Sequence, residues 1–301
     1  MGIYLSSPNV TKTSEDGEND TLRYGVSAMQ GWRMSMEDSH ISIPDLDKNT
    51  SLFAVFDGHG GAEVAKFCAD NFAKELLLNN SFKEGNYADA LRETFLRMDE
   101  ILMGENGMDL LRQYKQDTEM TTCFAGCTAN VVLIVDRKAY IANAGDSRCI
   151  SYTNDNKVLA LSYDHKPDNE EEKKRIVKAG GYVSDGRVND NLNLSRAIGD
   201  LEYKKSNELK PEEQIISAYP DVVEQSIDDQ AFFIIGCDGI WETKTAEEIC
   251  EITLDRLKGN PVGKISVIVG ELLDMLIAKE TTEGMGCDNM SCIIVQFKQT
   301  E

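Results

Sequence analysis

The sequence of 301 residues lacks several features that would place a protein in a membrane or on nucleic acid. No apolar run approaches the roughly 18 residues that a membrane-spanning helix needs, and the N-terminus has no apolar segment of the kind found in signal peptides. Basic residues are few, with 31 Lys and Arg against 52 Asp and Glu, which gives a formal net charge of -21. This charge argues against nucleic acid or an anionic membrane as the main partner, because both require a basic face. An acidic enzyme can still bind phosphate if metal ions reverse the sign of the local charge.

Histidine is scarce, and cysteine lacks the spacing that builds zinc sites. The 8 cysteines include no C-x-x-C pair. In the absence of an export signal we expect them to be reduced core residues of a cytosolic protein rather than disulfides. The 3 histidines, His40, His59 and His165, are too few for a histidine-rich zinc site. Any metal is therefore expected to be a hard cation held by oxygen, either Mg²⁺ or Mn²⁺.

Two apolar segments of the chain lead to the same dipeptide, Asp-Gly. Phe53–Phe56 precedes Asp57-Gly58, and Phe232–Ile235 leads to Asp238-Gly239. Both segments are typical of buried strands. A carboxylate at a strand end followed by glycine suits a hard cation, because the missing Cβ lets backbone carbonyls approach. Asp-Gly is also a common turn, so one copy indicates little, but two copies favour a carboxylate metal site.

A third group of charged residues follows the first predicted strand. Arg33 precedes Glu37 and Asp38 by four and five positions in a turn-rich stretch. This pattern fits either a surface cluster of salt bridges or an anion-binding arginine beside metal-binding carboxylates, and the segment alone favours the surface cluster. A further acid, Asp146, lies in a glycine turn between two predicted strands.

The order of the predicted elements favours an α+β fold. Residues 1–21 are expected to form a flexible lead-in, because residues 7–21 are polar and acidic. The predicted strands cover 22–30, 39–43, 123–135, 139–142, 148–152 and 290–297, and the predicted helices 62–79, 87–115, 168–179, 245–257 and 262–279. Asp168 is the expected N-cap of its helix, Thr245 is expected to form a capping box with Glu248, and residues 201–213 are expected to form a mobile loop. Strands before, between and after helix pairs favour antiparallel sheets with helices packed outside, in a single domain over 22–301.

Taken together, these motifs resemble the type 2C metal-dependent protein Ser/Thr phosphatases over nearly the whole chain. The matching segments are Arg33 with Met36-Glu37-Asp38, Asp57 to Gly61, Gly126 to Ala129, Asn143 to Arg148, Asp164 to Pro167, Arg187-Val188, Ser195 to Asp200, Cys237 to Trp241 and Asp288 to Ser291. The resemblance implies a central sandwich of two antiparallel β-sheets flanked by helix pairs. It also implies a cleft at one end of the sandwich that holds metal ions.

The resemblance implies a ligand set for two Mg²⁺ or Mn²⁺ ions. Asp57 would bridge the two ions. Asp238 and Asp288 would complete the protein ligands of one ion, and Glu37 and the backbone carbonyl of Gly58 those of the other.

The same resemblance implies three roles in catalysis. Arg33 would clamp the phosphate, His59 would act as the general acid, and Asp38 would orient a metal-bound water. The expected reaction is direct in-line attack on phosphoserine or phosphothreonine proteins by a water that the two ions activate. His59 would assist this reaction by protonating the leaving serine or threonine oxygen. No covalent nucleophile is expected.

The sequence departs from the family at a few positions. The family often has a third, looser metal site made by the equivalents of Asp146, Asp238 and an Asp where this chain has Glu242, so the geometry of that site is open. Asp190 replaces a usual glycine, and Cys287 stands where a polar or basic residue is common. No helical extension follows the last strand. None of these changes affects the two-metal core.

Two other functions remain as alternatives to the phosphatase. The first is a catalytically inactive, phosphatase-like binding module, which the retention of Asp57, Asp238 and Asp288 argues against. The second is a two-metal nuclease, which the acidic charge disfavours.

The N-terminus fits a short acylation pattern, with Gly2 followed by Ser6. A single myristoyl chain gives only marginal membrane binding, and the acids between Glu15 and Asp20 would be repelled by an anionic leaflet. We therefore expect a mainly cytoplasmic monomer with at most a minor membrane-associated fraction.

Overall fold

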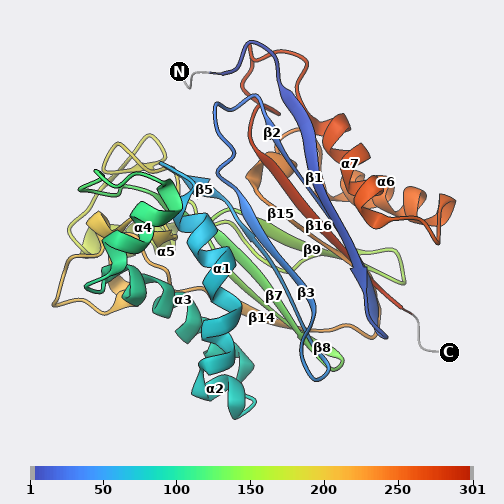
Figure 1. Ribbon diagram of the computed structural model, residues 1–301, viewed down its shortest axis with the longest axis horizontal. Helices are drawn as coiled ribbons and strands as arrows, with labels where there is room; N and C mark the ends of the chain where they lie inside the picture. Colours follow the sequence, from blue (N-terminus) through green and yellow to red (C-terminus); the bar gives the residue numbers. More distant parts are fainter. Residues whose placement is uncertain (1–3, 299–301) are drawn as a thin grey trace.

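Two antiparallel sheets packed face to face form the centre of the computed structural model, which describes residues 4–298 (Figure 1). The six-stranded sheet has the order β1 (Asn9–Glu18), β2 (Leu22–Gly31), β16 (Met290–Phe297), β15 (Gln230–Gly236), β9 (Arg148–Thr153) and β10 (Val158–Ala160). The five-stranded sheet has the order β14 (Asp221–Ser226), β8 (Lys138–Ala144), β7 (Ala129–Val135), β4 (Thr50–Phe56) and β3 (Ser39–Asp47). A small sheet of β13 (Ile198–Gly199), β6 (Gly126–Cys127) and β5 (Gly58–His59) lies beyond the end of β4, and β11 (Val183–Ser184) pairs with β12 (Arg187–Val188).

Helices cover the outer faces of both large sheets. The five-stranded sheet packs against α1 (Glu63–Leu78) and α3 (Tyr87–Met103), beside α2 (Asn80–Lys83) and α4 (Gly107–Lys115). The six-stranded sheet carries α6 (Ala246–Gly259) and α7 (Ile265–Leu276), and Figure 1 shows these two helices on the opposite side of the molecule from α1–α4. A smaller apolar cluster lies under α5 (Glu170–Lys178), and 3-10 turns occur at Leu201–Tyr203, Pro211–Glu213 and Asp238–Ile240. The predicted α+β sandwich flanked by helix pairs is confirmed.

Strand β4 illustrates why the apolar runs in the sequence are continuous. Phe53 and Val55 belong to the core between the two sheets, whereas Leu52, Ala54 and Phe56 belong to the core under α1 and α3. Because side chains alternate across a strand, a strand that is covered on both faces favours apolar residues at consecutive positions, as in Leu52–Phe56. The strand therefore holds its C-terminal end rigidly, and Asp57 is the next residue.

The expectation of a flexible lead-in is wrong for residues 9–18, which form edge strand β1. This strand pairs with β2 in antiparallel register, with Ser14 opposite Ser27. Its polar side chains are mostly exposed, and Asp16 accepts hydrogen bonds from the backbone N–H (2.8 Å) and Oγ (2.5 Å) of Ser266 in the first turn of α7. Backbone pairing and this helix cap hold a strand that has no apolar stripe. Further back, the N–H of Leu5 donates to the carbonyl of Trp32 (2.8 Å), and the predicted acylation site at Gly2 lies outside the described residues.

Other element boundaries also differ from the prediction. The expected helix over 87–115 is divided at Gly104 into α3 and α4, and Asn169 rather than Asp168 precedes α5. The segment 201–213 contains two 3-10 turns, and β14 was not predicted. The capping box of Thr245 and Glu248 is confirmed by reciprocal hydrogen bonds of 2.9 and 3.3 Å.

The cysteines and helix lengths agree with the composition. All the cysteines are free, and all but Cys123 are buried, as expected for reduced core residues. Across residues 4–298, no helix combines the length and the apolar character that crossing a bilayer requires.

The close packing of α7 on the six-stranded sheet yields a stability test at Gly25 of β2. A Cβ at this position would lie 2.1 Å from the backbone nitrogen of Ser266 and 2.4 Å from the carbonyl carbon of Ile265. Gly25→Ala must therefore push α7 away from the sheet, and we expect it to lower the free energy of unfolding by about 2 kcal/mol or more.

Urea unfolding followed by circular dichroism measures this effect. Gly259→Ala is the matched control, because a Cβ there meets no atom within 4 Å. Equal stability of the two variants would show that the contact between β2 and α7 is not as close as described.

Candidate active site

Three carboxylates that are far apart in the sequence meet at one end of the sandwich. Asp57 follows β4, Asp146 lies in the turn between β8 and β9, and Asp238 follows β15 by way of Cys237. One carboxylate oxygen from each lies within 4.8 Å of the others. Burial, followed by the charges of Asp146 and Asp288, raises the pKa of Asp238 to about 8. Burial and the neighbouring acids also raise the pKa of Asp57 well above its ordinary value, so the cluster is suited to a cation that would offset this repulsion.

Asp38 adds a fourth carboxylate to this end of the sheets. Its side chain is within 4.8 Å of Asp57 and of the sulfur of Cys237. Both carboxylate oxygens are buried, and neither has a hydrogen-bond partner among the described residues. Burial raises the pKa of Asp38 to about 6. Buried carboxylate oxygens normally have partners, so this pair fits a centre in which metal ions and their waters complete the contacts.

Glu37 and Asp288 are at the margin of the cluster and belong to neither group of mutually close donors among the described residues. Glu37 accepts hydrogen bonds from Ser35 Oγ (2.7 Å) and, more weakly, from the N–H of Gly61 (3.2 Å). The backbone of Gly58 passes so close to Glu37 that a Cβ on Gly58 would lie 2.4 Å from the Glu37 carbonyl oxygen. Only glycine permits this approach, which sets the backbones of Gly58 and Glu37 side by side.

Arg33 lies against the predicted metal ligands. Its guanidinium forms an ion pair with Asp288, 255 positions away, instead of pairing with the neighbouring Glu37 or Asp38. The side chain remains about half exposed, with 49% of its surface accessible. The Arg33 guanidinium is therefore accessible to solvent at the edge of the carboxylate cluster.

His59 in β5 has a carboxylate partner for which the sequence analysis gave no role. Its Nε2 lies 2.7 Å from Oδ2 of Asp200, whose side chain is only 1% exposed. Burial lowers the pKa of His59, but the charge and hydrogen bond of Asp200 outweigh it, and the net pKa is raised. Asp200 ends the quoted segment Ser195 to Asp200, and its position after a glycine was the only signal in the sequence.

Asn289 is a second residue whose role the sequence did not reveal. Its amide donates to the carbonyls of Gln30 (2.7 Å) and Ser35 (2.9 Å), and its Oδ1 accepts from the N–H of Glu37 (2.9 Å). These bonds hold the loop that carries Arg33 and Glu37 beside Asp288.

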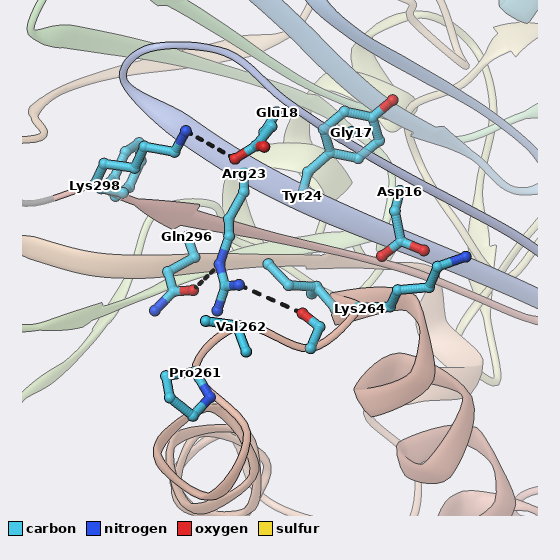
Figure 2. A pocket seen from close by; sticks show the side chains of 13 residues that line it. Asp16, Gly17, Glu18, Arg23, Tyr24, Pro261, Val262, Lys264, Gln296 and Lys298 are labelled. Carbon is cyan, nitrogen blue, oxygen red and sulfur yellow. Dashed lines mark hydrogen bonds and ion pairs between the residues drawn. The ribbon is translucent and has the colours of Figure 1, made fainter.

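A cavity of about 730 Å³ lies elsewhere, between the ends of β1, β2 and β16 and the α6–α7 loop (Figure 2). Figure 2 shows Glu18 paired with Lys298, and Arg23 donating to Gln296 and to the Gly263 carbonyl. These groups join strands and loop to one another. None of the predicted site residues lines this cavity, so the carboxylate cluster is the better candidate for catalysis.

Comparisons with known proteins agree with this site. The sequence pattern of the family described as Protein phosphatase 2C matches residues 22–285. The chain is 51% identical over 300 residues to probable protein phosphatase 2C 6 of Paramecium tetraurelia, covering 99% of this chain and 100% of the relative. It is 48% identical over 302 residues to protein phosphatase 2C 1 of the same organism, with the same coverage.

Solved structures show the same fold. A phosphatase from Toxoplasma gondii superposes with a TM-score of 0.77 at 25% identity, covering 97% of each chain. A serine-threonine phosphatase 2C from the same organism gives a TM-score of 0.75 at 20% identity, covering 98% of this chain and 99% of the other. By its sequence, its fold and the acids gathered at the ends of β4 and β15, the chain belongs to the protein phosphatase 2C family.

Proposed function

We propose that this protein serine/threonine phosphatase hydrolyses phosphoserine and phosphothreonine with two Mg²⁺ or Mn²⁺ ions held at the ends of β4 and β15. The observation that carries the proposal is the cluster of Asp38, Asp57, Asp146 and Asp238, in which both Asp38 oxygens are buried without a partner. Carboxylate and carbonyl oxygens are the donors that these hard ions prefer.

The proposed ligands come from four parts of the chain. Asp57 would be shared by the two ions, Asp238 and Asp288 would hold one of them, and Glu37 and the Gly58 carbonyl would hold the other. When bound, two such ions activate a water near neutral pH and stabilise charge on the phosphoryl oxygens. Asp38, whose carboxylate oxygens have no partner in the described residues, would accept a hydrogen bond from the attacking water and orient it.

Arg33 is the proposed binding residue for the phosphate. Its planar guanidinium can offer two parallel N–H donors to phosphate oxygens, and its half-exposed position leaves it open to a substrate. The ion pair with Asp288 keeps it next to the proposed ligands.

His59 is the proposed proton donor to the leaving serine or threonine oxygen. An alkoxide is a poor leaving group, so a positioned acid contributes typically 10²–10⁴-fold to the rate, roughly. Asp200 receives the Nε2–H and so fixes the orientation of the ring. No observation favours the inactive binding module, since the metal-binding acids are present and lie at one site.

The metal requirement is the first test of this function. We expect hydrolysis of phosphoserine and phosphothreonine peptides by metal-stripped protein to need added Mg²⁺ or Mn²⁺ and to stop in excess EDTA. Substitution of a residue that only supports a metal ligand typically lowers activity by roughly 10–100-fold. Asp57→Asn and Asp238→Asn, which change proposed ligands, should each lower activity by more than this. Asp155→Asn, in an exposed turn, is the control. Full activity in chelator, or unchanged metal binding by calorimetry in either ligand variant, would contradict the proposal.

His59 and Arg33 should fail in different ways. Arg33→Ala should raise KM, with any fall in kcat reporting contacts made only in the transition state. His59→Ala should lower kcat by about 10²-fold or more on phosphoserine peptides and much less on aryl phosphates, whose leaving groups need little protonation. Equal losses on the two substrate types would remove His59 from the role of acid.

We also propose that the protein is a mainly cytoplasmic monomer that is acylated at Gly2. One myristoyl chain gives an association constant of only about 10⁴ M⁻¹ for membranes, and the acids of β1 would weaken binding to anionic lipid. Intact-mass measurement of native protein should show the acyl group, and fractionation should leave most of the protein soluble. Recovery of nearly all of it on membranes, with release by Gly2→Ala, would show that the acids do not have this effect.

A further inference from the structure

A buried ion pair lies beside the segment that carries Asp200, the partner of His59. Nζ of Lys204 is 2.5 Å from Oδ2 of Asp99 in α3, and the two side chains are 3% and 9% exposed. Removing two charges from water is costly unless both groups also have further hydrogen-bond partners. Neither residue is among the proposed catalytic groups or metal ligands, so the further partners of this pair indicate what it supports.

Both charged groups also bind the backbone that leads to Asp200. Oδ1 of Asp99 accepts a hydrogen bond from the N–H of Gly199 (2.8 Å), which lies 100 positions away in the sequence. Nζ of Lys204 donates to the carbonyl of Ala197 (2.7 Å). The first of these contacts attaches the chain to α3, a helix that covers the five-stranded sheet. Asp99 therefore holds the backbone one residue before the carboxylate that binds His59.

The backbone at this point has a conformation that needs such support. The φ angles of Gly199 and Asp200 are 81° and 49°, and a left-handed conformation is unfavourable for a residue that has a Cβ. Such a conformation persists where the surrounding structure fixes it. The N–H of Asp200 donates to the Ala125 carbonyl (3.1 Å), and Asp99 holds the preceding residue. In this conformation Oδ2 of Asp200 lies 2.7 Å from Nε2 of His59.

We propose that Asp99 is a positioning residue for the proton donor, and that it acts on the ring of His59 through the backbone of Gly199 and Asp200. The inference rests on the proposed role of His59 as general acid. A proton donor contributes only within hydrogen-bond reach of the leaving oxygen, and a misplacement of about 1 Å can lower a rate by roughly 10²-fold. Loss of the bond from Gly199 to Asp99 is therefore expected to impair protonation of the leaving group and to leave metal binding intact.

Two double variants that differ at one side chain test this role in the full chain. Both contain Lys204→Met, so that no buried ammonium is left without its partner. Asp99→Leu removes the acceptor for the Gly199 N–H, whereas Asp99→Asn, of similar size, keeps an amide oxygen for it. Replacement of a buried ion pair by apolar side chains is often neutral for stability, so the variant with Asp99→Leu is expected to fold. Circular dichroism and Mn²⁺ calorimetry measure the fold and the metal binding of both variants.

The expected result is a loss that depends on the leaving group. Asp99→Leu with Lys204→Met should lower kcat at least about tenfold on phosphoserine peptides and much less on aryl phosphates, whose leaving groups need little protonation. Asp99→Asn with Lys204→Met should keep the wild-type ratio of the two rates. Asp99→Ala alone should show the same selective loss as Asp99→Leu. Added to His59→Ala, Asp99→Ala should cause no further loss on peptides, because effects that act through one group are not additive.

Two different failures can be told apart. Equal losses on the two substrate types in the Asp99→Leu and Asp99→Ala variants, or a further loss beyond that of His59→Ala, would assign the ion pair to stability alone. Either result would overturn the inference and leave the phosphatase function standing. If His59→Ala itself lowers both rates equally, the proposed acid and this inference fail together.

Discussion

The mutual repulsion of carboxylates buried at one end of the sandwich is the interaction on which the structure of the site depends. Asp38, Asp57, Asp146 and Asp238 lie close together; Asp38 and Asp146 are buried, and Asp57 and Asp238 are partly buried. A carboxylate in such surroundings either takes up a proton or pairs with a cation. The raised pKa values of Asp57 and Asp238 result from this burial and mutual repulsion. Strands β4 and β15, which lead to Asp57 and Asp238, are buried over nearly their whole length, so the packing of both sheets holds these two acids together against their repulsion.

A set of polar side chains holds the groups around these acids in fixed positions through hydrogen bonds. Asn289 holds the loop of Arg33 and Glu37, Asp200 holds the ring of His59, and His165 holds the Gly145–Asp146 turn. Each of these residues connects segments that are distant in sequence, and each makes its contact where burial makes a lost hydrogen bond costly. Catalytic groups supported in this way are positioned before a substrate arrives.

The sequence predicted the parts of the fold that depend on local patterns. The apolar runs before Asp57 and Asp238 identified two buried strands, and the meeting of these acids followed from their common position at strand ends. Strand β1 was missed because its polar residues give no apolar stripe, and its order depends on pairing with β2 and on the bond from Asp16 to Ser266. The partnership of His59 and Asp200 spans 141 positions, so no local pattern could reveal it. Arg33 likewise pairs with Asp288 and not with its sequence neighbours.

The hydrogen bond from Leu5 to Trp32 ties the start of the described chain to the residue before Arg33. Leu5 is therefore held beside the loop that carries Arg33. The bond couples the first described residues to that loop, so a displacement of Leu5 would be transmitted to the position of the arginine.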